Sequence, residues 1–247
     1  MKVSIILASF NSARTIERAL QSIVEQSYPH VELIVIDGAS EDGTLAILGL
    51  HRYAIDILVS ELDSGLYDAL NKGVSRATGD VLGFVHSDDF LADHRVITDI
   101  VDAFLSDSKV QAVYGDLKYV SSTETPDIVR HWTAGLFSPG KLERGWMPPH
   151  PTLYVKTAKF REVGAFDTSF RISADYDFCL RLFSNLGGNF VYIPRVLYFM
   201  RVGGASNGSL AKFALKASED IAVLKKNRIG GVFVVLRKIL SKVHQYF

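Results

Sequence analysis

The chain has 247 residues, 48% of them hydrophobic, which is enough for one large domain or two small ones with a sizeable core. Its 27 Lys and Arg residues balance 27 Asp and Glu residues, so no overall positive charge favours nucleic acid as a partner. The single cysteine, Cys179, excludes a disulfide framework and suits the reducing cytoplasm. The N-terminal apolar run is too short for a signal peptide, and no run of about 18 apolar residues predicts a membrane-spanning helix.

The first 90 residues alternate between predicted strands and predicted helices. Short apolar runs bounded by turn residues predict buried strands at residues 3–8, 31–36, 55–59 and 81–85. Amphipathic spacing predicts the intervening helices at about 13–25, 41–50 and 66–77. This alternation predicts an α/β fold, with a mostly parallel, Rossmann-like sheet and helices on both faces.

Polar or acidic residues follow each of these four strands. They are Ser9 and Asn11, then Asp37, then Glu61 and Asp63, then Ser87, Asp88 and Asp89. Parallel sheets bind ligands at the carboxyl ends of their strands, so this clustering favours a binding site at one sheet edge. Two adjacent carboxylates in isolation are common in surface turns. At the end of a buried strand they indicate a divalent cation that bridges to phosphate.

The segment after residue 8 lacks the glycine spacing of a dinucleotide-binding loop, and no P-loop is present. The phosphates of a bound nucleotide would therefore need a metal ion and helix N-termini.

The next part of the chain is less regular. We expect a helix at 96–105, a strand at 110–120, an irregular segment at 130–150, and two short strands at 190–193 and 196–200 around Pro194. Long irregular segments are often binding loops. Within this one, Trp146 could be an apolar platform for a sugar ring or an anchor for the loop.

Residues 172–183 predict a helix whose first turn is acidic. Ser173 is a candidate N-cap, and Asp175 and Asp177 lie where the helix dipole favours negative charge. Arg181 follows Asp177 by one turn and can pair with it. Both acids could serve the helix start alone, or one of them could be a general base.

Residues 209–247 predict helix interrupted at Gly230-Gly231, with many apolar residues and mostly basic charges. Such a segment can lie on an anionic membrane surface, or it can pack on the domain with its charges in water.

Residues 1–200 contain an ordered set of short motifs: Ala8-Ser9-Phe10-Asn11, residues 35–44, Asp63-Ser64-Gly65, Asn71-Lys72-Gly73, residues 77–80, Ser87-Asp88-Asp89, residues 164–167 and residues 175–181. The resemblance that these motifs carry is to family-2 inverting glycosyltransferases of the GT-A fold, most of all the bacterial enzymes that build polysaccharides and lipid-linked glycans. It implies a GT-A domain at 1–205, with a nucleotide-sugar half at 1–90 and an acceptor half at 91–205. A helical extension follows at 206–247.

The resemblance also implies roles for individual residues. Asp89 would bind Mn²⁺ or Mg²⁺, Asp88 would contact the metal or the ribose, and Asp175 would be the catalytic base. The other donor-binding positions would be Ala8, Ser9, Asn11, Asp37 (at the nucleobase), Asp63, Lys72 and Ser87.

Three positions depart from the family pattern. His86 stands where many relatives have an additional Asp, and Ala174 replaces a Glu that often precedes the base. Leu70 replaces a donor-binding Arg, for which Lys72 could substitute. His150 could touch phosphate or acceptor, or it could be a structural histidine.

The leading hypothesis is therefore a metal-dependent, inverting transfer from a nucleotide-sugar, most simply a UDP-sugar, to a hydroxyl of a glycan or lipid-linked acceptor. The expected location is the cytoplasm, with possible contact to the inner face of the membrane through residues 230–247. A sugar-phosphate nucleotidyltransferase is one alternative, although residues 8–14 lack its usual glycines. A non-catalytic nucleotide-sugar-binding protein is another, favoured if Asp175 lay far from Asp88 and Asp89.

Overall fold

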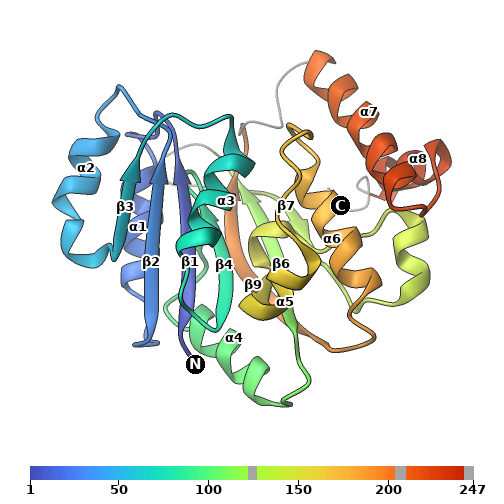
Figure 1. Cartoon of the computed structure of the whole chain (residues 1–247), viewed down its shortest axis with the longest axis horizontal. Coiled ribbons are helices and arrows are strands. Elements are labelled where there is room, and N and C mark those ends of the chain that lie inside the picture. Colours follow the sequence, from blue (N-terminus) through green and yellow to red (C-terminus); the bar gives the residue numbers. More distant parts are fainter. Residues whose placement is uncertain (122–126, 204–209, 242–247) are drawn as a thin grey trace.

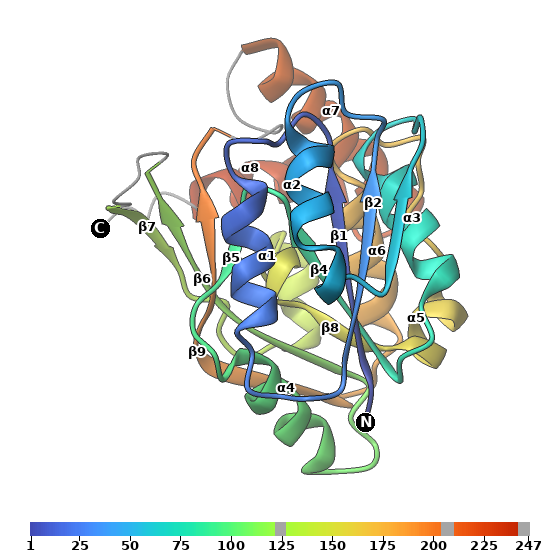
Figure 2. The ribbon, with the colours of Figure 1, turned by 90° about the vertical axis from the view of Figure 1, so that its left-hand side faces the viewer.

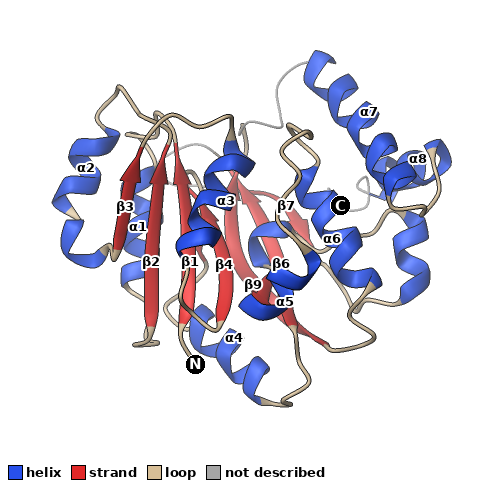
Figure 3. Ribbon diagram, viewed as in Figure 1, coloured by secondary structure: helices blue, strands red, loops and turns tan. Residues whose placement is uncertain are grey.

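The computed structural model describes residues 1–121, 127–203 and 210–241. One curled sheet forms the centre of the described chain, in the order β3-β2-β1-β4-β8-β6-β9-β5, with β7 paired to β6 (Figure 1). The four N-terminal strands are parallel: β1 (Val3–Ser9), β2 (Val31–Asp37), β3 (Ile57–Ser60) and β4 (Val81–His86). The expected α/β fold is confirmed, and these strands end at the same edge of the sheet (Figure 3).

The second half of the sheet mixes strand directions. Strands β6 (Ala112–Val120) and β9 (Phe190–Arg201) are parallel to each other. Three short strands run antiparallel to their neighbours, namely β5 (Phe90–Leu91), β7 (Ile128–Trp132) and β8 (Tyr154–Lys156). Strand β8 joins β4 to β6 and so connects the two halves into one sheet.

Helices cover both faces of the sheet, as Figure 2 shows from the side. One hydrophobic cluster contains side chains of α1 (Ile16–Val24), α2 (Thr44–Leu50) and α4 (Val96–Leu105). The other contains side chains of α3 (Leu66–Arg76), α5 (Thr157–Val163), α6 (Ala174–Ser184), α7 (Leu210–Lys226) and α8 (Val232–Ser241). The sheet therefore has two cores, and the C-terminal helices belong to the one that contains α6.

Two expectations about the second half were wrong. The segment 130–150 is not irregular throughout, because its first residues belong to β7, an edge strand paired only with β6 in the described chain. The two strands expected around Pro194 form one strand, β9. Its register against β6 jumps from Ile193 to Val196, so a bulge accommodates the proline, which has no N–H to donate.

The C-terminal helices are separated at Gly230, whose φ of 123° favours glycine, so the expected break is confirmed. Val223, Leu224, Val234 and Val235 are buried against the domain, while other apolar side chains of α8 face outward. None of the helices in residues 1–121, 127–203 and 210–241 is long and apolar enough to cross a membrane.

Candidate active site

The carboxylate of Asp37 links the carboxyl ends of β1, β2 and β3 through hydrogen bonds. It is fully buried, and its two carboxylate oxygens accept hydrogen bonds from the hydroxyls of Ser9 (2.9 Å), Ser40 (2.6 Å) and Ser60 (2.9 Å). The backbone N–H of Ser40 adds a fourth bond at 2.8 Å. In this structure Asp37 orders the strand ends, and its expected contact with a nucleobase stays a prediction.

The loops after β1, β2 and β4 are joined by hydrogen bonds. Asn11 has a φ of 47°, a left-handed conformation that asparagine tolerates. Its N–H donates to Ser40 Oγ at 2.8 Å, and its Oδ1 accepts from the N–H of Glu41 at 3.0 Å. The hydroxyls of Ser12 and Ser87 are 2.7 Å apart. Ala8, the neighbour of Ser9, lies in register with both Ile36 and His86, so all these donor-site candidates lie at one edge.

The loop after β3 places Asp63 against the loop after β2. A Cβ atom on Gly38 would lie 2.6 Å from Asp63 Oδ2, so the missing side chain of Gly38 makes room for this carboxylate. Lys72 Nζ donates to the carbonyl of Leu62 at 2.7 Å and pairs with Glu61 at 3.1 Å. Lys72 therefore holds this loop in the present structure. Phe10, 63% exposed and beside Gly38, is a candidate that the sequence analysis missed.

Asp89 is the least satisfied buried acid at this edge. It is 1% exposed, and among the described residues its Oδ1 accepts a single hydrogen bond, from the N–H of Arg201 at 3.3 Å. Its Oδ2 has no hydrogen-bond partner among the described residues. Burial and the nearby charge of Asp88 raise the pKa of Asp89 well above its usual value. A buried carboxylate with an unused oxygen beside a second carboxylate suits a divalent cation.

No group of three or more His, Cys, Asp or Glu side chains within residues 1–121, 127–203 and 210–241 could hold a metal ion alone. Asp88 and Asp89 could supply part of a coordination shell, and a diphosphate and water would complete it, as is common for Mg²⁺ and Mn²⁺. The residues present therefore fit a cation that binds together with its substrate.

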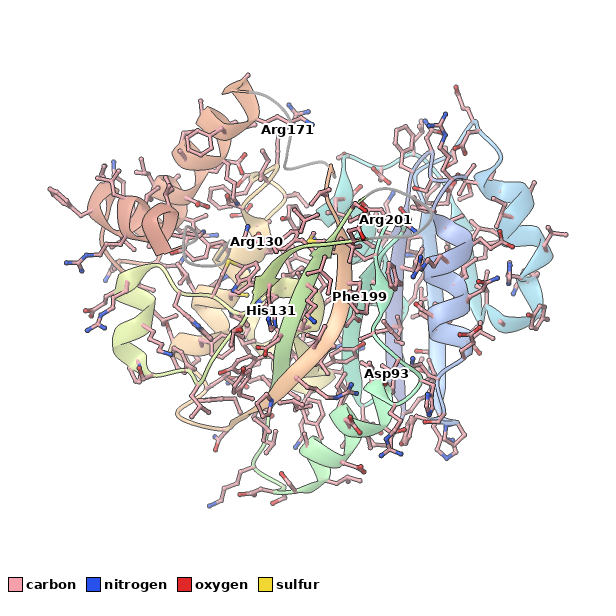
Figure 4. All side chains as sticks on the ribbon, turned by 180° about the vertical axis from the view of Figure 1, so that it is seen from behind. Asp93, Arg130, His131, Arg171, Phe199 and Arg201 are labelled. Atoms are coloured by element: carbon pink, nitrogen blue, oxygen red, sulfur yellow. The ribbon has the colours of Figure 1, made fainter. Side chains whose placement is uncertain are left out.

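A pair of arginines lies next to this carboxylate. The guanidinium carbon of Arg18 is 3.8 Å from the centre of the Phe90 ring, and that of Arg201 is 5.8 Å from the same ring. Figure 4 shows Arg201 on β9, on the same strand as Phe199, whose ring lies 5.2 Å from that of Phe90. Burial, and then the charge of Arg201, lower the pKa of Arg18, so the two guanidinium groups lie near each other. The charge of Arg201 also acts on Asp89, where it opposes the rise in the pKa of that acid.

Two histidines connect the metal-site candidates to Asp175. The His150 ring stacks on Phe84 at 5.4 Å and lies 6.1 Å from the His86 ring. Burial lowers the pKa of His150 to about 4 although the charge of Asp175 opposes it. Burial also lowers the pKa of His86, against the charges of Asp88 and Asp175. The charges of Asp88 and Asp175 thus both act on His86, which argues against the non-catalytic alternative.

These two histidines keep ring nitrogens that are unused within the described chain. Both ring nitrogens of His150 and Nδ1 of His86 are buried and have no hydrogen-bond partner among the described residues. A histidine that were purely structural would normally bond at least one nitrogen. His150 therefore has hydrogen-bonding capacity left for a ligand.

The structure separates the two acids of the α6 first turn. Asp177 is fully buried, and its carboxylate pairs with Arg181 Nε at 2.8 Å, as expected, and with Lys226 Nζ at 3.1 Å. Asp175 Oδ1 accepts the N–H of Tyr176 at 2.7 Å, and the described residues give Asp175 no ion pair. Asp177 thus has a structural role, and Asp175 is left as the candidate base.

Trp146 lies in an aromatic cluster. Its ring is 5.1 Å from Phe137 and 5.2 Å from Phe183, and its indole N–H donates to the carbonyl of Ala134 at 2.8 Å. These contacts are those of a loop anchor, the second of the two roles considered. Cys179 is buried, as expected for a core thiol.

The sequence and fold resemble known proteins. Residues 4–170 match the sequence profile of "Glycosyl transferase family 2". A PGL/p-HBAD biosynthesis glycosyltransferase of Mycobacterium bovis is 31% identical over 219 residues, which cover 86% of this chain and 82% of the relative. An uncharacterized glycosyltransferase of Nostoc sp. is 26% identical over 232 residues, which cover 89% and 70%.

Solved structures share the GT-A fold at low sequence identity. Residues 1–349 of Staphylococcus aureus TarS align with a TM-score of 0.70 at 21% identity, covering 98% of this chain and 72% of that TarS fragment. A mannosyltransferase from Pyrobaculum calidifontis, solved with GDP-Man and Mn²⁺, aligns with a TM-score of 0.67 at 21% identity, covering 96% and 69%. With a profile match over most of the chain and a relative above 30% identity, the protein belongs to glycosyltransferase family 2 and is a glycosyltransferase.

Proposed function

We propose that this enzyme transfers a sugar from a UDP-sugar to a hydroxyl of a glycan or lipid-linked acceptor, with inversion at the anomeric carbon. The observation that carries the proposal is the unused buried oxygen of Asp89, which lies beside Asp88. The charges of Asp88 and Asp175 both act on the pKa of His86, so both acids lie near that ring. TarS has been solved with UDP and with UDP-GlcNAc, which supports uridine as the base. Family membership argues against the nucleotidyltransferase alternative.

The donor binds at the carboxyl edge of β1 to β4 in this proposal. Asp88 and Asp89 would hold Mn²⁺ or Mg²⁺, which would neutralise charge on the diphosphate. The nucleoside lies on the loops after the first three strands, within reach of the following residues: Ala8, Ser9, Asn11, Asp37, Asp63, Lys72 and Ser87. Phe10 adds an exposed aromatic face beside them.

Asp175 is the general base in this proposal. It accepts the proton of the acceptor hydroxyl as that oxygen attacks the anomeric carbon from the side opposite the nucleotide. The bond to the nucleotide oxygen breaks in the same displacement, so the configuration inverts. Because the pKa of His150 is about 4, His150 is neutral near pH 7, and its two unused nitrogens can hydrogen-bond an acceptor hydroxyl or a phosphate. Trp146 supports the acceptor side through its loop.

The halves at 1–90 and 91–205 would bind donor and acceptor respectively. The extension at 206–247 would bring the enzyme to its acceptor at the inner membrane face in the cytoplasm. Val232, Phe233 and Leu236 are 53%, 82% and 50% exposed on α8, and basic residues accompany them. An exposed apolar helix face with basic neighbours suits an anionic membrane surface.

Two variants test the assignment of roles together. Calorimetry with UDP and Mn²⁺ is expected to show at least a tenfold weaker metal-dependent binding in Asp89→Ala. Asp175→Asn should bind UDP within about twofold of wild type but hydrolyse UDP-glucose or UDP-N-acetylglucosamine roughly 10²–10⁴-fold more slowly. Asp107→Asn, on a distant surface turn, is the matched control. Unchanged UDP binding in Asp89→Ala would refute its ligand role, and full turnover in Asp175→Asn would refute the base.

A further inference from the structure

A carboxylate from the C-terminal extension holds the turn that precedes α6, the helix that carries Asp175. Glu219, on α7, is 8% exposed, and its Oε1 accepts the N–H of Arg171 at 2.9 Å. Its Oε2 accepts the N–H groups of Ile172 at 2.8 Å and Ser173 at 2.9 Å. Arg171 and Ile172 precede α6, and Ser173 is its N-cap, so Glu219 satisfies N–H groups of the turn that leads into the helix.

Ser173, the expected capping residue, directs its hydroxyl to a different partner. Ser173 is the N-cap of α6, as predicted, but its side chain makes no capping bond. Its hydroxyl donates to Asp220 Oδ1 at 2.7 Å, and Asp220 Oδ2 lies 3.0 Å from Lys238 Nζ of α8. The Lys238 ammonium also lies 3.2 Å from the ring centre of Tyr176, the neighbour of Asp175. Both C-terminal helices thus contact the first turn of α6.

The same turn is held from the donor half of the molecule. The hydroxyl of Tyr67, on α3, donates to the carbonyl of Ile172 at 2.7 Å. Burial, and then the charges of Asp175 and Glu219, raise the pKa of Tyr67 well above its usual value, which places this hydroxyl beside both acids. The backbone of residues 171–173 is therefore bonded through its N–H groups to the extension and through a carbonyl to α3.

We propose that Glu219 is a positioning residue for the catalytic base: by fixing residues 171–173 against Tyr67, it sets the orientation of Asp175 toward the acceptor. The inference rests on the proposed function, in which Asp175 is the base. Glu219 lies outside the matched family segment, residues 4–170, and 46 residues beyond Ser173. A misplacement of about 1 Å at a catalytic group can lower the rate on the order of 10²-fold. The hydrogen bond of Glu219 to Ser173, two residues before the base, is therefore expected to affect turnover.

The test replaces one acceptor oxygen without changing the size of the side chain. Glu219→Gln turns an amide NH₂ toward N–H donors, so the turn must shift or lose a bond. We expect kcat for hydrolysis of UDP-glucose or UDP-N-acetylglucosamine to fall about tenfold, while the Kd for UDP with Mn²⁺ stays within twofold. Tyr67→Phe, which loosens the turn from the opposite side, should lower kcat in the same direction without weakening UDP binding.

A control separates positioning from loss of stability. Leu224→Ala, also buried on α7, removes packing but leaves the Glu219 carboxylate in place. Assayed below the Tm of both variants, Leu224→Ala should keep a kcat near that of wild type. If its kcat falls as far as that of Glu219→Gln, Glu219 acts through stability alone and the proposal is overturned.

Two further measurements distinguish this inference from the assignment of the base. In an Asp175→Asn background, Glu219→Gln should reduce turnover no further, because its effect acts through that side chain. Full turnover in Asp175→Asn alone would instead overturn the base. Hydrogen exchange of the amides of residues 171–173 should become faster in Glu219→Gln. If the exchange of these amides were unchanged, Glu219 would not be what fixes residues 171–173, and the proposal would be overturned without any activity data.

Discussion

The buried acids of this protein differ in how completely their oxygens are used. Asp37 accepts four hydrogen bonds, and Asp177 is paired with two cations. Glu219 accepts three backbone N–H groups. Asp89 alone among these four keeps an oxygen with no partner in the described chain. Because burying an unused carboxylate oxygen costs free energy, this contrast points to Asp89 as the group kept for a ligand.

Glu32 shows the opposite case, an acid used for stability at the other end of the sheet. It accepts bonds from Lys2 Nζ at 2.6 Å, Ser4 Oγ at 2.5 Å, and the N–H and hydroxyl of Thr78 at 2.9 and 2.5 Å. Burial alone would raise the pKa of Glu32, but these bonds outweigh it and lower the pKa from 4.5 to about 2.

The depressed pKa of Glu32 predicts a pH-dependent contribution to stability. Glu32→Gln should lower the free energy of unfolding by about 1–3 kcal/mol at pH 7. The contribution is fully present above pH 4.5, the ordinary pKa, and is lost as the pH falls through about 2, because the unfolded chain takes up the proton first. Urea unfolding of both proteins from pH 7 to 3 measures this gap. A gap that stays constant to pH 3 would contradict the prediction.

For individual residues, the sequence predicted which side chains gather at the sheet edge, because the apolar pattern of each strand shows where the strand ends. The helix pattern alone did not decide between Asp175 and Asp177, which only the family resemblance separated, because the pairing of Asp177 with Lys226 depends on a helix far along the chain. Glu219 was not predicted for the same reason. An acid within a helical run looks like any exposed acid until the packing of that helix is known.

The approach of α3 to β1 depends on one glycine. A Cβ atom on Gly73 would lie 2.4 Å from Cγ2 of Ile6, which is buried in the sheet. Helix α3 therefore contacts the strand through its backbone at this point. The same helix carries Tyr67, so the height of α3 above the sheet also sets the position of the turn before Asp175.

Gly73→Ala should accordingly destabilise the protein by about 1–3 kcal/mol, as overpacking of a dense core does. Gly49→Ala is the matched control, because it lies in α2 with no atom near the added methyl group. That change should raise stability by about 0.4–1 kcal/mol. Thermal unfolding of the two variants checks both signs. Equal Tm shifts in the same direction would show that close packing at Gly73 is not the cause.

Elements with strong local signals were predicted best. The alternation of apolar runs located β1 to β4 and their helices to within a few residues, because each run is bounded by turn residues. Strand β7 was missed because it is short and exposed or half-buried along its whole length, Ile128 and Val129 included, as suits an edge strand. Strand β9 was divided in two because the sequence cannot show that a bulge absorbs Pro194.

At the scale of the whole molecule, α7 and α8 lie beside α6, at the opposite side from α2 (Figure 1). The inward side chains of α8 join the core, while Phe233 and Leu236 face outward. The two alternatives for the extension, packing on the domain and lying on a membrane, are therefore compatible, because they use different faces of one helix.

Phe233→Ser with Leu236→Ser should reduce binding to phosphatidylglycerol vesicles about tenfold or more, because each side chain contributes apolar area to the bilayer interface. Thermal stability should change little, since both side chains are exposed. Leu105→Ser, an equally exposed apolar residue on α4, is the control and should not affect binding. Vesicle co-sedimentation measures the effect. Undiminished pelleting of the double variant would count against α8 as the membrane-facing surface.

The contact between Glu219 and the turn before α6 also affects the order in which the chain can fold during synthesis. Glu219 follows Ser173 by 46 residues, so at roughly 5–20 residues per second a ribosome takes about 2–10 s to supply it. Strands β1 to β4 and their loops come earlier in the chain and do not need it. A nascent chain would thus assemble the proposed nucleotide-binding edge first and the turn before the proposed base last. On this proposal, a chain arrested before α7 would bind a donor that it is not yet arranged to use.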